Sequence, residues 1–189
     1  MHFVEAKARA HDPDPEHNEI VTRLALELFE GLRGLHGYGP EERRLLEIAG
    51  RLHDIGWSQV VSGKHHKISG RLIRDLAIPG VDKKELAMIS LIARFHSKSM
   101  PDPKRHRRFA ALDADARERV EWLAAVLRVA DGLDNRHLRV VKGASCAVGR
   151  KTIRIRLDAS GDCRAEVERA GEKQDLLERV SERKIRYLC

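Results

Sequence analysis

Five separated motifs of histidine and aspartate are the residues of this chain whose types and spacing could do chemistry. An adjacent pair, His53-Asp54, ends a segment in which apolar side chains recur at helical spacing. The other motifs fall at the ends or on the apolar faces of further expected helices: His17, His65 or His66, His96 and Asp131. Nitrogen and oxygen donors together suit divalent ions such as Mn, Fe, Co, Ni, Zn or Mg. The pattern therefore predicts a metal centre.

The placement of these side chains supports that prediction. Asp131 follows Leu127 and Leu123 by four and eight residues, so it lies on their apolar face. A carboxylate in such a position is costly to bury unless it is paired or bound to a metal. Each motif alone is explained by packing or helix capping. Together they would need exhaustive hydrogen bonding, which one metal centre satisfies at once.

Helices are expected to position these residues. Apolar side chains recur at helical spacing before, between and after the motifs. Gly56 suits the left-handed residue that often closes a helix. The expected helices cover about residues 16–35, about 41 to the His53-Asp54 pair, 65 to before Pro79, 81–95 and 113–133, with a loop at 97–110.

The periodicity of apolar residues changes after about Arg139, from helical spacing to alternation. Alternation of apolar and polar residues predicts strands at 151–157 and 164–168, with a turn at 160–162 between them. A helix is expected at 172–181 and a last strand at 184–188. The expected fold is thus mostly α, with a helical domain at residues 1–140 and a small α+β appendage packed on it at residues 141–189.

Composition narrows the class of protein. The 189 residues are 42% hydrophobic, and their net charge of +7 favours anionic partners, although no nucleic-acid-binding motif accompanies the charge. The N-terminal residues do not form a signal peptide, and no apolar run is long enough to span a membrane. Cys146, Cys163 and Cys189 form no CxxC motif, so reduced thiols and a cytoplasmic location are expected.

The order of a histidine, a His-Asp pair and an aspartate on successive helices resembles the HD superfamily of metal-dependent phosphohydrolases. A narrower resemblance, over about residues 12–188, is to the C-terminal HD-like region of the exopolyphosphatase/guanosine pentaphosphate phosphohydrolase family. The segments that carry it are Leu52–Trp57 (LHDIGW), His65–Ser69 (HHKIS), Arg94–Lys98 (RFHSK) and Leu127–Asp134 (LRVADGLD).

This resemblance implies a helical HD bundle with one or two divalent metal ions. His17, His53, Asp54 and Asp131 would hold the first ion. His66 and His96 would hold a second ion, with Asp54 as the bridge and with His53 and Asp54 at the catalytic centre. The family's histidine precedes its serine by three positions, as His66 precedes Ser69, so the resemblance implies His66, with its neighbour His65 as the alternative.

The expected function is hydrolysis of a phosphate ester or nucleotide-type substrate by a metal-activated water. The alternative is a non-catalytic module that binds a nucleotide or polyphosphate, or that regulates a partner. The chain contains none of the actin-like domains that hydrolyse polyphosphate in the long relatives, so exopolyphosphatase activity is not expected to carry over.

The expected partners are phosphorylated small molecules or nucleotides, with polyphosphate as a further candidate and homodimer formation left open. Membranes and nucleic acids are not expected partners. Lys98, Arg105, Arg107 and Arg108 follow His96 and either form a solvated loop or hold the distal phosphates of a substrate.

Overall fold

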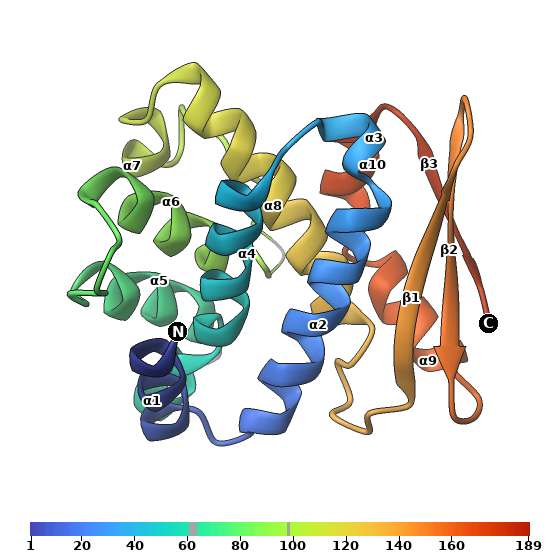
Figure 1. Ribbon diagram of the computed structural model, residues 1–189, viewed down its shortest axis with the longest axis horizontal. Helices are drawn as coiled ribbons and strands as arrows, with labels where there is room; N and C mark the ends of the chain where they lie inside the picture. Colours follow the sequence, from blue (N-terminus) through green and yellow to red (C-terminus); the bar gives the residue numbers. More distant parts are fainter. Residues whose placement is uncertain (61–63, 98) are drawn as a thin grey trace.

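Two long helices, α2 (Pro15–Gly31) and α8 (Ala114–Gly132), form the centre of the structure, and the other helices pack around them (Figure 1). The computed structural model describes residues 1–60, 64–97 and 99–189. Within these residues the other helices are α1 (His2–His11), α3 (Arg33–His36), α4 (Pro40–Leu52), the 3-10 helix η1 (Ile55–Gln59), α5 (His65–Arg74), α6 (Lys83–Arg94), α7 (Arg107–Ala110), α9 (Arg164–Gly171) and α10 (Asp175–Ser181).

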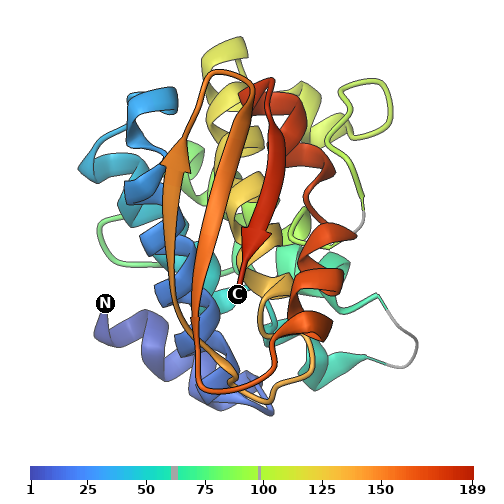
Figure 2. The ribbon, with the colours of Figure 1, turned by 90° about the vertical axis from the view of Figure 1, so that its right-hand side faces the viewer.

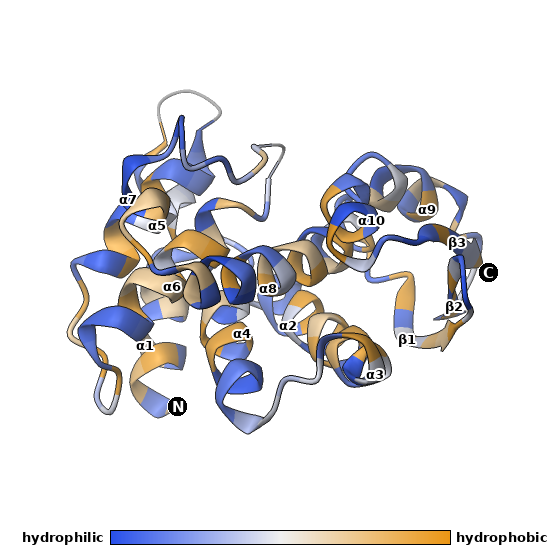
Figure 3. Ribbon diagram, turned by 90° about the horizontal axis from the view of Figure 1, so that it is seen from above, coloured by the Kyte–Doolittle hydropathy of each residue, from blue (hydrophilic) through white to orange (hydrophobic). Residues whose placement is uncertain are grey.

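Local sequence signals begin these helices, and apolar burial holds them together. Asp14 accepts a hydrogen bond from the N–H of His17 at the start of α2, and Asp113 does the same for Ala116 at the start of α8. Every residue of α8 from Trp122 to Gly132 is buried, as expected for a central helix. Seen from above, the apolar residues of the bundle gather where its helices face one another (Figure 3).

A three-stranded sheet covers one end of the molecule (Figure 2). Its strands are β1 (Val141–Val148), β2 (Thr152–Ala159) and β3 (Lys184–Leu188). β1 pairs with β2 antiparallel, whereas β3 pairs with β2 in parallel after the chain has crossed over through α9 and α10. Alternate residues of β2 are buried, and β1 packs against α2. The sheet thereby packs on α2 through β1 and on α10 through β3.

The predicted fold class is confirmed in its coarse form, a mostly helical chain with a small sheet near the C-terminus. The predicted helix at 16–35 stops at Gly31 and is followed by the short α3, while α1 in the polar N-terminal segment was not predicted. A short helix, α7, also lies in the predicted loop at 97–110. The proposed domain boundary between residues 140 and 141 stays a prediction.

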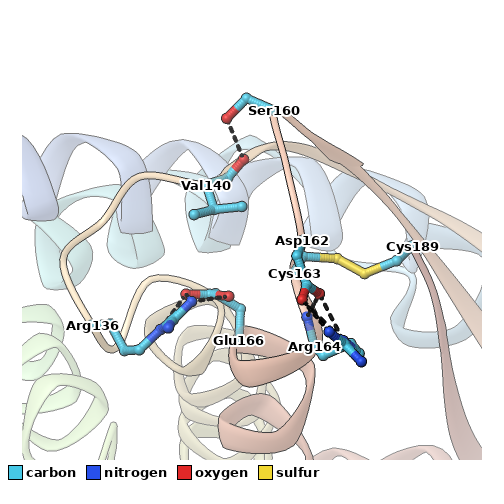
Figure 4. The surroundings of a disulfide bond; sticks show 8 residues. All are labelled: Arg136, Val140, Ser160, Asp162, Cys163, Arg164, Glu166 and Cys189. Atoms are coloured by element: carbon cyan, nitrogen blue, oxygen red, sulfur yellow. Dashed lines mark hydrogen bonds and ion pairs between the residues drawn. A yellow bond between two sulfur atoms is a disulfide. The ribbon is translucent and has the colours of Figure 1, made fainter.

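The strand predicted at 164–168 is wrong, because this segment belongs to helix α9. Five alternating residues are too few to distinguish a strand from a helix when tertiary contacts decide. Glu166 is buried in a bidentate ion pair with Arg136 (Figure 4). Ala170 packs closely on Gly132, because a Cβ on Gly132 would lie only 2.6 Å from the Cα of Ala170. The antiparallel partner of β2 is instead β1, which was not predicted.

A disulfide joins Cys163 and Cys189, so the expectation of three reduced thiols is wrong for these two residues (Figure 4). Their Cα atoms lie 6.5 Å apart because the end of β3 returns to the start of α9. This proximity depends on the crossover and is invisible in a spacing of 26 residues. Cys146 is the free cysteine.

A thiol count tests this pairing. Protein purified without reductant and then unfolded should show one titratable thiol per chain, and reduction should expose all three cysteines. Cys189→Ser should lower the free energy of unfolding by roughly 3–4 kcal/mol, because it releases a closed loop of this length. Cys146→Ser is the control, and it should abolish the thiol signal under non-reducing conditions. Three thiols without reductant would contradict the disulfide.

Candidate metal centre

The ends of five helices bring the predicted ligands to one place. His17 lies in the first turn of α2, and Asp131 lies in the last turn of α8. His53 and Asp54 follow the last residue of α4, and His96 comes two residues after the end of α6. All five are buried, so the bundle excludes most water from the carboxylates and imidazoles.

Two histidines and two aspartates surround the first candidate ion position. The Nε2 atom of His17 lies 3.6 Å from Asp131 Oδ1 and 3.9 Å from Asp54 Oδ2. The Nε2 atom of His53 lies 3.8 Å and 3.7 Å from the same two oxygens. These four donor atoms come from three helix ends, and they belong to the residues expected from the sequence to hold the first ion.

A second group forms around the other oxygen of Asp54. Asp54 Oδ1 lies 3.4 Å from His65 Nε2 and 3.6 Å from His96 Nε2, and these two nitrogens are 3.1 Å apart. Asp54 therefore turns one oxygen to each pair of imidazoles. This is the arrangement that a carboxylate bridging two cations requires.

Hydrogen bonds on the outer side of the rings orient the imidazoles. His53 Nδ1 lies 2.6 Å from the carbonyl oxygen of Gly50, and His96 Nδ1 lies 2.6 Å from that of Ala93. Because a carbonyl oxygen can only accept, these Nδ1 atoms carry the proton and the Nε2 lone pairs face the cluster. His17 Nδ1 pairs with Asp134 Oδ2 at 2.9 Å. Such outer contacts are typical of metal-binding histidines.

The inner atoms of the cluster fit a cation. Among the described residues, His17 Nε2, His53 Nε2 and Asp54 Oδ1 are buried without a hydrogen-bond partner. Unpartnered buried polar atoms are destabilising by about 1–3 kcal/mol each. A divalent ion would satisfy all of them, and the mixed imidazole and carboxylate donors suit a transition metal or Mg.

Electrostatics also favour a cation. Burial would lower the pKa of His17, but hydrogen bonds to Asp131 and Asp134 raise it to about 10. Burial lowers the pKa of His96 to about 3, which keeps this ring neutral. For Asp131, burial would raise the pKa, yet the ammonium of Lys173 and the ring of His17 hold it well below its usual range. The centre thus holds ionised carboxylates beside the neutral ring of His96 and beside His17, which is protonated at neutral pH while no ion is bound.

The geometry favours His65 over His66 as the sixth ligand. His66 belongs to none of the converging groups, and its ring centroid lies 6.4 Å from that of His96. Burial lowers the pKa of His66 to about 4. The spacing to Ser69 pointed to His66, but Ser69 uses its hydroxyl oxygen to accept from the N–H of Gly56. The first residue of α5 is the one that faces the cluster.

Three contributing residues were not predicted. Asp134 is buried behind His17, and its position three residues after Asp131 was an available signal. Trp57 donates from Nε1 to Asp54 Oδ2 at 3.2 Å and stacks on His65 with 4.3 Å between ring centroids. Lys173 forms an ion pair with Asp131 across 42 residues of sequence, and no sequence pattern announces it.

The predicted basic run lies beside a cavity of about 650 Å³ between α5, α6 and α7. Arg105, Arg107 and Arg108 line it together with Lys67, Arg71, Arg74 and Arg94. None of the candidate metal ligands lines this cavity, so these arginines are not at the mouth of the cluster itself. The cavity and the candidate centre share two helices: α5 begins with His65, and α6 ends two residues before His96. Lys98 lies outside the described residues.

The chain belongs to the Ppx/GppA phosphatase, domain III, family, whose model matches residues 2–168. This confirms the resemblance to the C-terminal region of the exopolyphosphatase family and relates the chain to phosphatases. A search of curated proteins gave no match to the chain. None of the described helices has the length and apolar character needed to cross a membrane.

Gly56 is required by a close approach rather than by a left-handed backbone, which corrects the role predicted for it. It lies inside η1, and among the described glycines only Gly37 and Gly80 have positive φ. A Cβ on Gly56 would lie 2.3 Å from the carbonyl oxygen of His65 and 2.6 Å from the backbone nitrogen of Ser69. Only a residue without a side chain lets α5 bring His65 to the cluster.

Gly56→Ala should therefore displace the start of α5 and weaken metal binding. We expect metal affinity to fall at least about 10-fold, because one ligand loses its orientation, and Tm to fall by several degrees. Isothermal titration and thermal unfolding measure both quantities. Gly34→Ala is the matched control, since a Cβ there meets nothing within 4 Å, and it should leave both unchanged. A wild-type affinity in Gly56→Ala would contradict the close-approach argument.

Replacing His65 and His66 separately tests the choice between them. His65→Ala should lower the number of bound ions per chain at saturating metal, because Asp54 Oδ1 would keep only one imidazole partner. His66→Ala should leave the number unchanged, which makes it the matched control from the adjacent position. Elemental analysis after gel filtration supplies the count. Loss of metal in His66→Ala alone would reverse the assignment.

Proposed function

We propose that this chain is an HD-type metal-dependent phosphohydrolase that cleaves a phosphate ester or nucleotide-type substrate. The observation that carries the proposal is the convergence of the buried Nε2 atoms of His17 and His53, which have no hydrogen-bond partner among the described residues, on carboxylate oxygens of Asp54 and Asp131. Membership of a phosphatase family supports the same reaction class. The proposed ligands follow the histidine, His-Asp, aspartate order of the HD superfamily.

The reaction needs little more than this centre. A divalent ion held by His17, His53, Asp54 and Asp131 would lower the pKa of a water and withdraw charge from the phosphoryl oxygens. Hydrolysis forms a bond from the water oxygen to phosphorus and breaks the bond from phosphorus to the leaving oxygen, which finally takes up a proton. No protein nucleophile is consumed, and no covalent intermediate with the chain is required.

The surrounding residues fix the centre and leave one side open. Trp57 and Asp134 hold Asp54 and His17 in place from outside the cluster. His65 is the most exposed member of the cluster, with 17% of its side chain accessible. A substrate therefore reaches the carboxylate of Asp54 from the side on which His65 lies.

The basic cavity supplies a place for further phosphates. Arg94, Arg105, Arg107 and Arg108 make no ion pair with any described carboxylate, so their charges are available to an anion. The guanidinium group grips two phosphate oxygens at once. A long phosphate chain or a nucleotide polyphosphate could occupy this cavity, whereas a small monophosphate would stay at the metal centre.

A turnover assay on phosphorylated metabolites with Mn, Co, Ni or Mg tests the proposal. The metal-loaded protein should release phosphate, and chelation should abolish the release and lower Tm because a bound ion stabilises the folded state. Asp54→Asn should lose activity by at least about 1,000-fold, since the shared ligand is removed. Asp75→Asn, on an aspartate whose side chain is 65% exposed, is the control. A protein that binds metal and polyphosphate without turnover would instead be the non-catalytic module.

The arginines of the cavity should matter only for long substrates. Changing Arg105, Arg107 and Arg108 together to Ser should raise KM for a polyphosphorylated substrate by about 10-fold, because three exposed charge contacts are lost. The effect should shrink as salt rises, since such charges are screened over about 8–10 Å. KM for a small monophosphate should not change.

A second triple variant controls for net charge. Arg150, Arg154 and Arg186 are exposed on the sheet, and their replacement by Ser removes the same charge at another surface. That variant should keep the KM of the wild-type protein for both substrates. Equal losses on both substrates in the cavity variant, or none on either, would remove these arginines from the binding site.

A further inference from the structure

The turn between α9 and α10 delivers a lysine to the proposed metal centre. Lys173 Nζ donates to Asp131 Oδ2, and only 12% of the Lys173 side chain is exposed. Lys173 lies in the C-terminal appendage and beyond residue 168, where the match to the family model ends. The appendage therefore contributes a charged group to a cluster otherwise built by the helical bundle.

The ammonium lies beside the proposed ligand cluster rather than inside it. Asp131 Oδ1 faces His17 and His53 at 3.6 Å and 3.8 Å, whereas Asp131 Oδ2 faces Lys173. The two oxygens of one carboxylate thus separate the histidine side from the lysine side. Among Lys173 and the proposed ligands, Lys173 and His65 are the least buried, with 12% and 17% of their side chains exposed.

Backbone contacts hold Lys173 in this position. Its N–H donates to the carbonyl oxygen of Ala170 at 3.0 Å, and its own carbonyl accepts from Arg128 Nε at 3.2 Å. Arg128 is 1% exposed and also donates to Asp175 Oδ1 at 2.6 Å and to the carbonyl oxygen of Ser97 at 2.5 Å. The buried guanidinium of Arg128 thereby links two segments: the turn that contains Lys173 and the residues that follow His96.

The ammonium keeps donors for another anion. A lysine ammonium has three N–H donors, and among the described residues Asp131 is the one acceptor of Nζ. Removing an ammonium from most of its water is unfavourable unless anions replace that water. A phosphoryl group at the metal centre would supply such oxygens on the open side of Asp131.

We propose that Lys173 is a catalytic residue that donates to a phosphoryl oxygen of the substrate. This inference rests on the function proposed above and adds that the appendage completes the site. A fixed cation at this place stabilises the negative charge of the phosphoryl group, including the charge that develops in the transition state.

Lys173→Gln separates this role from a structural one. The glutamine amide can still donate to Asp131 Oδ2, but it removes the charge that would bind phosphate. Elemental analysis should show unchanged metal content, while calorimetry with inorganic phosphate should show a dissociation constant raised roughly 10- to 100-fold, as for the loss of a charged hydrogen bond. Lys151→Gln, on an exposed lysine of the β1–β2 hairpin, is the control and should change neither value.

Each other result has a definite meaning. Unchanged phosphate affinity in metal-loaded Lys173→Gln overturns the inference and leaves the phosphohydrolase proposal standing. Loss of metal from that variant also overturns it, because Lys173 would then only position Asp131. A wild-type protein without metal-dependent hydrolysis defeats the proposed function and this inference together. If Lys173→Gln does not fold, Lys173→Met, which keeps the apolar stem, is measured in the same way and decides by the same criteria.

Discussion

The buried carboxylate of Asp54 is the constraint on which the rest of the structure depends. It lies between two pairs of imidazoles, with one oxygen toward His17 and His53 and the other toward His65 and His96. An ionised carboxylate in a protein interior is strongly destabilising without counter-charges. Helix ends from α2, α4, α5, α6 and α8 therefore have to meet around it, and this requirement sets the packing of the bundle.

The groups that position the histidines and carboxylates of the cluster come from two sides. On the bundle side, Asp134 and two backbone carbonyls orient the histidines so that their Nε2 atoms face inward. On the appendage side, Lys173 pairs with Asp131, and Arg128 connects that turn to the loop after α6. A substitution that displaces the appendage should therefore also displace Lys173 and Asp131 at the candidate metal centre. The close contact between Gly132 and Ala170 adds a second connection between α8 and α9.

The sequence predicted much of the candidate site because the candidate ligands occur at helix ends, where apolar periodicity stops at a polar residue. His17, His53, Asp54, His96 and Asp131 were all found in this way, and the structure brings them together. The sequence could not decide between His65 and His66, because adjacent residues at a helix start point in different directions; in the structure His65 faces the cluster and Ser69 accepts a hydrogen bond from Gly56.

The appendage was harder to predict. Its contributions depend on contacts between segments that are distant in sequence, such as Lys173 with Asp131 and Cys163 with Cys189. The alternation at 164–168 predicted a strand with Ala165 and Val167 on its buried face. In the structure Glu166 is the buried residue of this segment because it pairs with Arg136, and hydropathy alone cannot indicate that burial. The helices of the bundle can be predicted from local apolar periodicity, whereas the structure of the appendage depends on contacts between distant segments.

Anomalous X-ray diffraction from crystals of the manganese-loaded protein tests the central claim most directly. The account predicts a strong anomalous peak bounded by the Nε2 atoms of His17 and His53 and by oxygens of Asp54 and Asp131, with a second peak near His65 and His96 if two ions bind. An absence of anomalous density among these side chains, with manganese found elsewhere or not at all, would contradict it.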